Sequence, residues 1–245
     1  MHRGASGWTT FHGDWPVLRG VAGSGPDDVW AVGDGVLHWD GSAWTPVDAP
    51  AAALNAVWAA SPSDAWALGP AGALLRWNGA TWSKVSGVTT QDLTGVWGAN
   101  AADLWMVSAT EALHWTDGVL ERWPLSNVKG SYRVSGTGPD DVWFAGPRVF
   151  RWDGVALRED PTWSAPITLC IPYIRGVFAG APGAVWLVGS VSSVMGGGCG
   201  DFILRWDGTG WRLESDYSHG WGSAVWGPSA DLVWVAGSTL AYQRN

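Results

Sequence analysis

The sequence predicts an all-β fold, a six-bladed β-propeller built from four-stranded antiparallel blades. Three observations predict it: a sixfold repeat, four short strand-like segments in each repeat, and 22 tryptophans among 245 residues. A repeat of roughly 40 residues is typical of a propeller blade and is too long for a leucine-rich repeat. Tryptophan at this density indicates a repeating core, because aromatic side chains dominate the packing of such cores.

One tryptophan in the second strand marks each repeat. These anchoring tryptophans follow one another at intervals of 36 to 48 residues, at Trp30, Trp66, Trp105, Trp143, Trp186 and Trp234. We expect them to pack between blades, together with the tryptophans that precede each Asp-Gly. The same packing is expected for the inner-strand residues Trp58, Trp97 and Trp226.

The four strands of a repeat are easiest to follow in the first unit. Its inner strand is Leu18–Gly23, and the next two segments read VWAVG and VLHWDG. The terminal Asp-Gly of the third segment is a strong hairpin signal. A fourth strand follows with its own tryptophan, Trp44. One domain therefore covers 1–245, with blades at about 18–53, 54–92, 93–130, 131–172, 173–220 and 221–245 joined to 1–17.

The chain ends suggest how the ring closes. The sixth unit stops after its third strand, and the segment 7–11 (GWTTF) matches 43–47 (AWTPV), an outer strand. We therefore expect the N-terminal strand to complete the last blade. Such closure removes the free sheet edges that invite aggregation.

The repeat pattern GSGPDDVWAVG…HWDGxxW resembles the Trp-rich β-propeller repeats of bacterial cell-surface and secreted proteins, over residues 5–245. It is distantly similar to WD-repeat and lectin propellers. The resemblance implies a fold, and it supplies no catalytic motif. The buried Asp-His-Ser-Trp network of WD repeats is not expected, because His38 and His114 directly precede a tryptophan.

Two insertions are expected on one face of the ring, which we call the insertion face. They are Asp160–Pro172, between blades four and five, and Gly189–Asp201, between the middle strands of blade five. Each carries one of the two cysteines, Cys170 and Cys199. A disulfide between them is predicted and would favour an oxidising compartment, at the cell surface or outside the cell. The alternative is two unrelated thiols.

Candidate ligand-binding residues lie in the connections between blades on that face. Trp15, Trp163 and Trp221 fall outside the four-strand pattern, and an exposed indole suits stacking on a sugar ring. The alternative is that these indoles fill the loops. Polar residues near them in sequence complete the candidate site: Asp14, Asp160, Asp216, Tyr217 and His219.

Two repeated polar features favour structural roles. The acidic pairs Asp27-Asp28 and Asp140-Asp141 suit tight turns better than cation binding. A basic residue recurs on the third strand, where it could line sugar sites but is better explained as a solvated or stacked structural position. It occurs as His38, Arg76, His114, Arg151 and Arg205.

Composition narrows the function classes. The net charge of −8 argues against nucleic acid and anionic membranes as partners, and no apolar run is long enough for a transmembrane span. Phosphate loops, nucleophile elbows and metal-ligand spacings are missing, so no catalytic residue, metal or cofactor is predicted.

The sequence therefore predicts a monomeric, non-enzymatic binding module that recognises glycans or another surface polymer. A protein-interaction scaffold is the first alternative. An enzyme with its site at the mouth of the channel is the second, since fold alone does not determine function.

Overall fold

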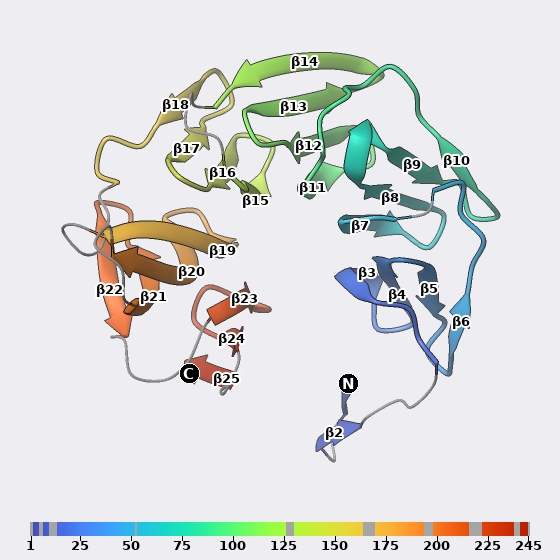
Figure 1. Cartoon of the computed structure of the whole chain (residues 1–245), viewed down its shortest axis with the longest axis horizontal. Coiled ribbons are helices and arrows are strands. Elements are labelled where there is room, and N and C mark those ends of the chain that lie inside the picture. The colour runs from blue at the N-terminus through green and yellow to red at the C-terminus, as the bar shows by residue number, and fades with distance from the viewer. Residues whose placement is uncertain are drawn as a thin grey trace.

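The computed structural model describes residues 2–4, 7–9, 14–51, 53–125, 130–163, 170–193, 198–215, 222–237 and 241–244. It is an all-β propeller in which antiparallel sheets are arranged around a centre (Figure 1). Each sheet is formed by strands that follow one another in the chain, as the short hairpin connections predict. Among the described residues, no helix is long and apolar enough to cross a membrane.

The inner strands face the centre of the ring, and the other strands follow outwards in chain order (Figure 1). The inner strands are β3 (Leu18–Gly25), β7 (Ala56–Ser61), β11 (Gly95–Asn100), β15 (Arg133–Gly138), β19 (Cys170–Ala181) and β23 (Gly222–Trp226). The second strands are β4 (Asp28–Gly33), β8 (Asp64–Leu68), β12 (Asp103–Val107), β16 (Asp141–Ala145), β20 (Ala184–Ser193) and β24 (Val233–Gly237).

In most blades the third and fourth strands are shorter than the two inner strands. The third strands are β5 (Val36–Trp39), β9 (Leu74–Trp77), β13 (Glu111–Thr116), β17 (Val149–Trp152), β21 (Gly198–Trp206) and β25 (Ala241–Arg244). The outermost strands are β6 (Trp44–Pro46), β10 (Trp82–Lys84), β14 (Val119–Pro124), β18 (Leu157–Glu159) and β22 (Trp211–Ser215). One short 3₁₀ helix, η1 (Pro70–Gly72), connects β8 to β9.

The structure has five complete four-stranded blades, so the expectation of six is wrong. The sixth repeat forms a three-stranded last sheet, in which β25 pairs with β24. The N-terminal strand β2 (Gly7–Thr9) pairs instead with β1 (His2–Gly4). A local hairpin has a much smaller loop-closure cost than pairing across the whole chain, which explains this outcome.

Five of the six anchoring tryptophans form the interfaces between neighbouring blades, as expected, whereas Trp234 is half-buried. These five are at most 1% exposed: Trp30, Trp66, Trp105, Trp143 and Trp186. The ring centroid of Trp30, for example, lies 4.9 Å from that of Trp77 and 5.0 Å from that of Trp82 in the next blade. The inner-strand Trp226 is an exception, since it is 63% exposed.

Blade five differs from the others because its insertion extends the sheet. The predicted loop Gly189–Asp201 is largely a hairpin, in which β20 continues to Ser193 and β21 begins at Gly198. Val191 and Phe202 lie in this extension and are 3% and 1% exposed. Their burial explains why the insertion is ordered as strands, since the added sheet covers apolar surface.

Aspartates after the third strands hold the next turn. The Asp40 carboxylate accepts hydrogen bonds from the backbone N–H and hydroxyl of Ser42 and from the N–H of Ala43, at 2.8, 2.7 and 2.9 Å. These bonds, the Ser42 hydroxyl first, lower the pKa of Asp40 from 3.8 to about 2. Blade two uses Asn78, whose side-chain oxygen accepts from Ala80 and Thr81.

The Asp40 turn gives a pH-dependent prediction. Because its pKa is lowered by folding, the stabilisation is complete above pH 3.8 and is lost as the pH falls towards about 2. We expect Asp40→Asn to retain the neutral-pH melting temperature, as the natural Asn78 turn indicates, and to melt with a shallower decline across this acidic range. Thermal melts of both proteins test it. An unchanged acid response would show that the Asp40 carboxylate contributes nothing to acid sensitivity.

Candidate functional site

The repeated basic residue of the third strand packs on the anchoring tryptophan of its own blade. In blade three, His114 stacks on Trp105 with ring centroids 3.9 Å apart and lies 2.8 Å from an Asp103 carboxylate oxygen. In blade two, the Arg76 guanidinium donates a hydrogen bond to the Asp64 carboxylate at 2.6 Å and lies 5.1 Å from the centroid of the Trp66 ring. The structural interpretation of this position is confirmed, because stacking and a carboxylate already engage the basic group.

The second aspartate of the acidic turns has a role that the turn explanation missed. Asp28 is 3% exposed and accepts from the Ser24 hydroxyl, while a nitrogen of His38 lies 2.7 Å away. His38 in turn stacks on Trp30. An Asp, His, Ser and Trp therefore do come together in blade one, against the expectation that no such network would form.

Two of the predicted ligand residues hold the connection between blades four and five. Asp160 is 9% exposed and accepts from the N–H and hydroxyl of Thr162 and from the indole N–H of Trp211, at 2.9, 2.8 and 2.8 Å. Trp163 is half-buried and packs edge-on against Trp211, with ring centroids 5.8 Å apart. These contacts attach the linker to blade five, and a ligand role for either residue stays a prediction.

The other predicted ligand residues are elsewhere. Asp14 and Trp15 precede blade one and are exposed, and Trp15 lines a pocket on that blade. The structure thus divides the predicted site between two regions of the ring. The remaining four lie outside the described residues: Trp221, Asp216, Tyr217 and His219.

The strand pairing does not support the predicted disulfide. Cys170 lies in β19 opposite Ser193, and Cys199 lies in β21, so β20 runs between them. Strands are spaced by about 4.8 Å, which puts two strands on either side of a third roughly 10 Å apart. That exceeds the separation of about 7 Å beyond which a disulfide cannot form without backbone movement. The side chains of both cysteines lie outside the described part of the structure.

A different group of residues on blades four and five forms the candidate site, which we call the basic–aromatic patch. It consists of Arg133, Tyr173, Arg175, Ser190 and Asp201. Tyr173, Ser190 and Asp201 face one another across three adjacent strands, so their side chains share one face of the sheet. Arg175 donates to the Ser190 hydroxyl at 3.4 Å, and Tyr173 is 52% exposed.

Arg133 occupies a position that the fold reserves for small residues. It pairs with the residue two after the anchoring tryptophan, where the other inner strands have Gly20, Ala56, Gly95, Gly176 and Ala224. The reason for small residues is close approach of the next strand: a Cβ on Gly20 would lie 3.0 Å from the Cα of Ala56. The fold itself therefore gives no reason for an arginine here.

The electrostatics of the patch favour an anion. Burial, and then repulsion by Arg175, lower the pKa of Arg133 from its usual value. Among the described residues no carboxylate pairs with Arg133, whose guanidinium donates to the Tyr132 carbonyl at 3.1 Å. Burial raises the pKa of Asp201, although Arg175 opposes the change. An arginine stays charged in proteins, so a desolvated guanidinium is stabilised by an anionic partner.

Two members of this patch, Ser190 and Asp201, lie in the insertion Gly189–Asp201, but the sequence did not indicate that this insertion continues the sheet as a hairpin. The usable signal was Arg133, a long charged side chain at a repeat position that otherwise has glycine or alanine. Tyr173 and Asp201 gave no such signal, because their proximity depends on the register of the extended hairpin. Among the described residues, no three His, Cys, Asp or Glu side chains gather as a metal site would require.

No protein-family profile and no curated protein sequence matches the chain. Solved structures of other proteins do match the chain. YCF48 bound to D1 peptide aligns with a TM-score of 0.70 and 16% identity, covering 96% of this chain and 80% of that one. The WD40 repeats of RRP9 align with a TM-score of 0.69 and 10% identity, covering 89% and 72%.

An enzyme is also among the matches. The GH74 xyloglucanase from Xanthomonas campestris aligns with a TM-score of 0.69 and 13% identity, covering 93% of this chain and 45% of that one. Identities this low show the fold alone. The fold that they share with this chain is the β-propeller, and the narrower resemblance to Trp-rich bacterial repeats stays a prediction.

Proposed function

We propose that the chain is a non-enzymatic interaction module that binds an acidic segment of a partner protein at the basic–aromatic patch. The observation that carries this proposal is Arg133, a largely desolvated guanidinium without a carboxylate partner in the described structure, beside a second arginine. Arginine and tyrosine are enriched among the residues that dominate protein interfaces. Arg133, Arg175 and Tyr173 supply both types in one place.

The charge of the whole chain sharpens the choice of partner. With a net charge of −8, the protein repels long polyanions, so a small basic region favours a short acidic peptide over nucleic acid. A propeller with a peptide partner is found among the similar structures, in YCF48 bound to D1 peptide. A protein partner is therefore better supported than the glycan that the sequence suggested first.

Arg133→Met tests the proposal with two readouts of opposite sign. Replacing a desolvated charge by an apolar side chain is expected to raise the free energy of unfolding, by about 1 kcal/mol. The same change should weaken binding to an acidic peptide array at least tenfold, or about 1.4 kcal/mol. A purely structural arginine would give a loss of stability without a selective loss of binding.

Further variants distinguish binding at the basic–aromatic patch from a general effect of positive charge. Arg148→Met removes an exposed arginine paired with Glu159 at 3.1 Å, so it should leave acidic-peptide binding unchanged. Arg175→Met should weaken binding as Arg133→Met does. Equal binding by all variants would exclude the patch. Selective binding on a glycan array, lost in Trp15→Ala, would return the function to the glycan hypothesis.

A further inference from the structure

At one repeated contact between neighbouring blades, the sizes of the two facing residues on the inner strands complement each other. Trp58 of blade two lies over Gly98 of blade three, and Trp97 of blade three lies over Gly136 of blade four. A Cβ on either glycine would come within 2.7 Å of the facing indole. A large aromatic residue on one blade therefore requires a glycine on the next.

Two further interfaces follow the same rule. Phe178 of blade five lies against Gly227 of the last sheet, where an added Cβ would be 3.1 Å from its ring. Blade four has a small residue, Ser135, and faces Ala179, whose N–H donates to the Ser135 hydroxyl at 3.0 Å. The size of the residue on each blade thus predicts the residue on its neighbour.

At the two ends of the ring, this pairing of a large aromatic residue with a glycine is incomplete. The last sheet ends in Trp226, which is 63% exposed, and blade one has Gly23 at the position equivalent to Gly98. Val21 beside it is 69% exposed, whereas its equivalent Val57, inside a filled interface, is 6% exposed. Both ends therefore have the surface of an interface that lacks its other half.

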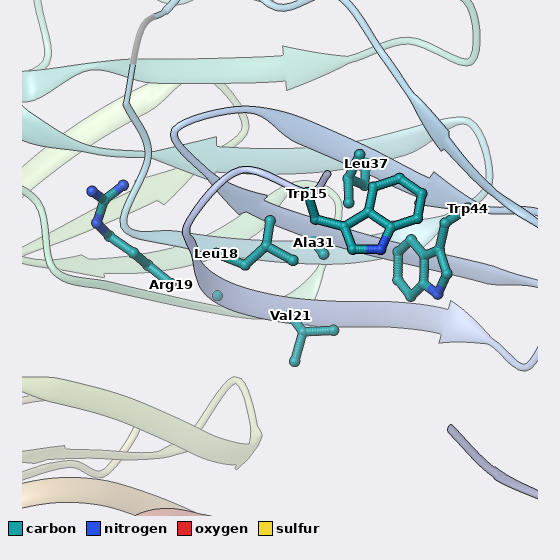
Figure 2. A pocket seen from close by; sticks show the side chains of 8 residues that line it. Trp15, Leu18, Arg19, Val21, Ala31, Leu37 and Trp44 are labelled. Carbon is teal, nitrogen blue, oxygen red and sulfur yellow. The ribbon is translucent and has the colours of Figure 1, made fainter. Parts of the chain in front are cut away.

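A pocket of about 400 Å³ lies on this face of blade one. Figure 2 shows the indoles of Trp15 and Trp44 beside Leu37 and Ala31, with Val21 on the inner strand below them. The equivalents of Ala31, Leu37 and Trp44 in blade two are Ala67, Leu75 and Trp82, which hold the anchoring Trp30. The pocket is therefore lined by the same residue types that hold an anchoring tryptophan in blade two, and we call it the seat.

The chain's own sheets do not fill this seat. The six described sheets of three or four strands follow one another around the ring, with a gap between the first and the last, and the two-stranded sheet of β1 and β2 lies outside that order (Figure 1). Blade one and the last sheet each present an interface of this repeat type, so a layer of β-sheet rather than a single side chain would fit both.

We propose that the opening between blade one and the last sheet binds one β-sheet blade of this same repeat type, presented by a polypeptide other than these 245 residues. One face of that blade carries an anchoring tryptophan for the pocket and an aromatic residue over Gly23. Its other face carries a glycine under Trp226. Blade three has this pattern, with Trp97 and Trp105 towards the next blade and Gly98 towards the previous one.

The first experiment compares two variants of the same residue type. Val21→Asp should leave the melting temperature of the purified chain nearly unchanged, because Val21 faces the opening. Val57→Asp should lower it strongly, because it buries a charge in a filled interface. Light scattering over a dilution series accompanies both. If Val21→Asp destabilises a monomer as much as Val57→Asp does, the last sheet of the same chain fills the seat and the proposal fails.

The second experiment supplies the blade. A synthetic peptide of residues 93–125, the third blade, should bind the full chain saturably and raise its melting temperature. Binding should weaken at least tenfold for Val21→Asp and for the peptide with Trp105→Ala. No saturable binding, or a concentration-dependent dimer of the unmodified chain that Val21→Asp disrupts, would overturn the proposal. The patch variant Arg133→Met should bind this peptide normally, which keeps this test independent of the acidic-peptide site.

Discussion

Replacing Trp105 by alanine is expected to lower the free energy of unfolding by about 3–5 kcal/mol, the range for large aromatic residues in cores. Trp105 is fully buried and lies between two blades, with ring centroids 5.1 Å from Phe144 and 5.2 Å from Trp152. It also stacks on His114. Denaturant unfolding followed by circular dichroism measures the change.

The loss at Trp105 should come from packing alone. Its indole N–H is buried without a hydrogen-bond partner among the described residues, so the substitution breaks no hydrogen bond. The control is Trp226→Ala, which removes a 63% exposed indole and should change stability by less than about 1 kcal/mol. Equal losses in the two variants would show that the last sheet packs as tightly in solution as the inner blades.

Asp141→Ala is expected to lower the free energy of unfolding by about 3 kcal/mol, although it removes few atoms. The Asp141 carboxylate is 5% exposed and accepts from the Thr137 hydroxyl, the Trp143 indole N–H and the Arg151 guanidinium, at 2.7, 3.0 and 2.9 Å. Without it, donors in and beside the core lose their acceptor. Thermal and denaturant unfolding provide the measurement.

The preceding aspartate is the matched control for this prediction. Asp140 belongs to the same turn but is exposed, so Asp140→Ala should stay within about 0.5 kcal/mol of the parent protein. Equal costs at the two positions would mean that both aspartates act only by stabilising the turn. That outcome would favour the interpretation drawn from the sequence over the network in the structure.

The sequence was sufficient for the blades because their signals are local. Anchoring tryptophans and Asp-Gly turns fixed where each strand would lie, and the five complete blades follow that order. Closure of the ring was a long-range inference from similarity between 7–11 and 43–47. An outer strand such as β6 has only three residues, so its few ladder bonds specify its partner weakly.

The candidate site was harder to predict, for reasons that particular residues illustrate. Asp160 and Trp163 looked like loop residues, but their surroundings are set by Trp211, which lies 51 residues after Asp160. The cysteines appeared close because both belong to insertions, yet the hairpin places a strand between them. Only Arg133 carried a local signal, since it departs from the small residues of its repeat position.

Every sheet in the described structure is formed from strands that are consecutive in the chain. No sheet therefore has to wait for the arrival of a distant segment, because β2 pairs with β1 and not with β25. Contacts that are close in sequence favour fast folding and limit the time for which strand edges are exposed. During synthesis, each blade can form as soon as its own residues have left the ribosome, and it then provides a surface on which the next one packs.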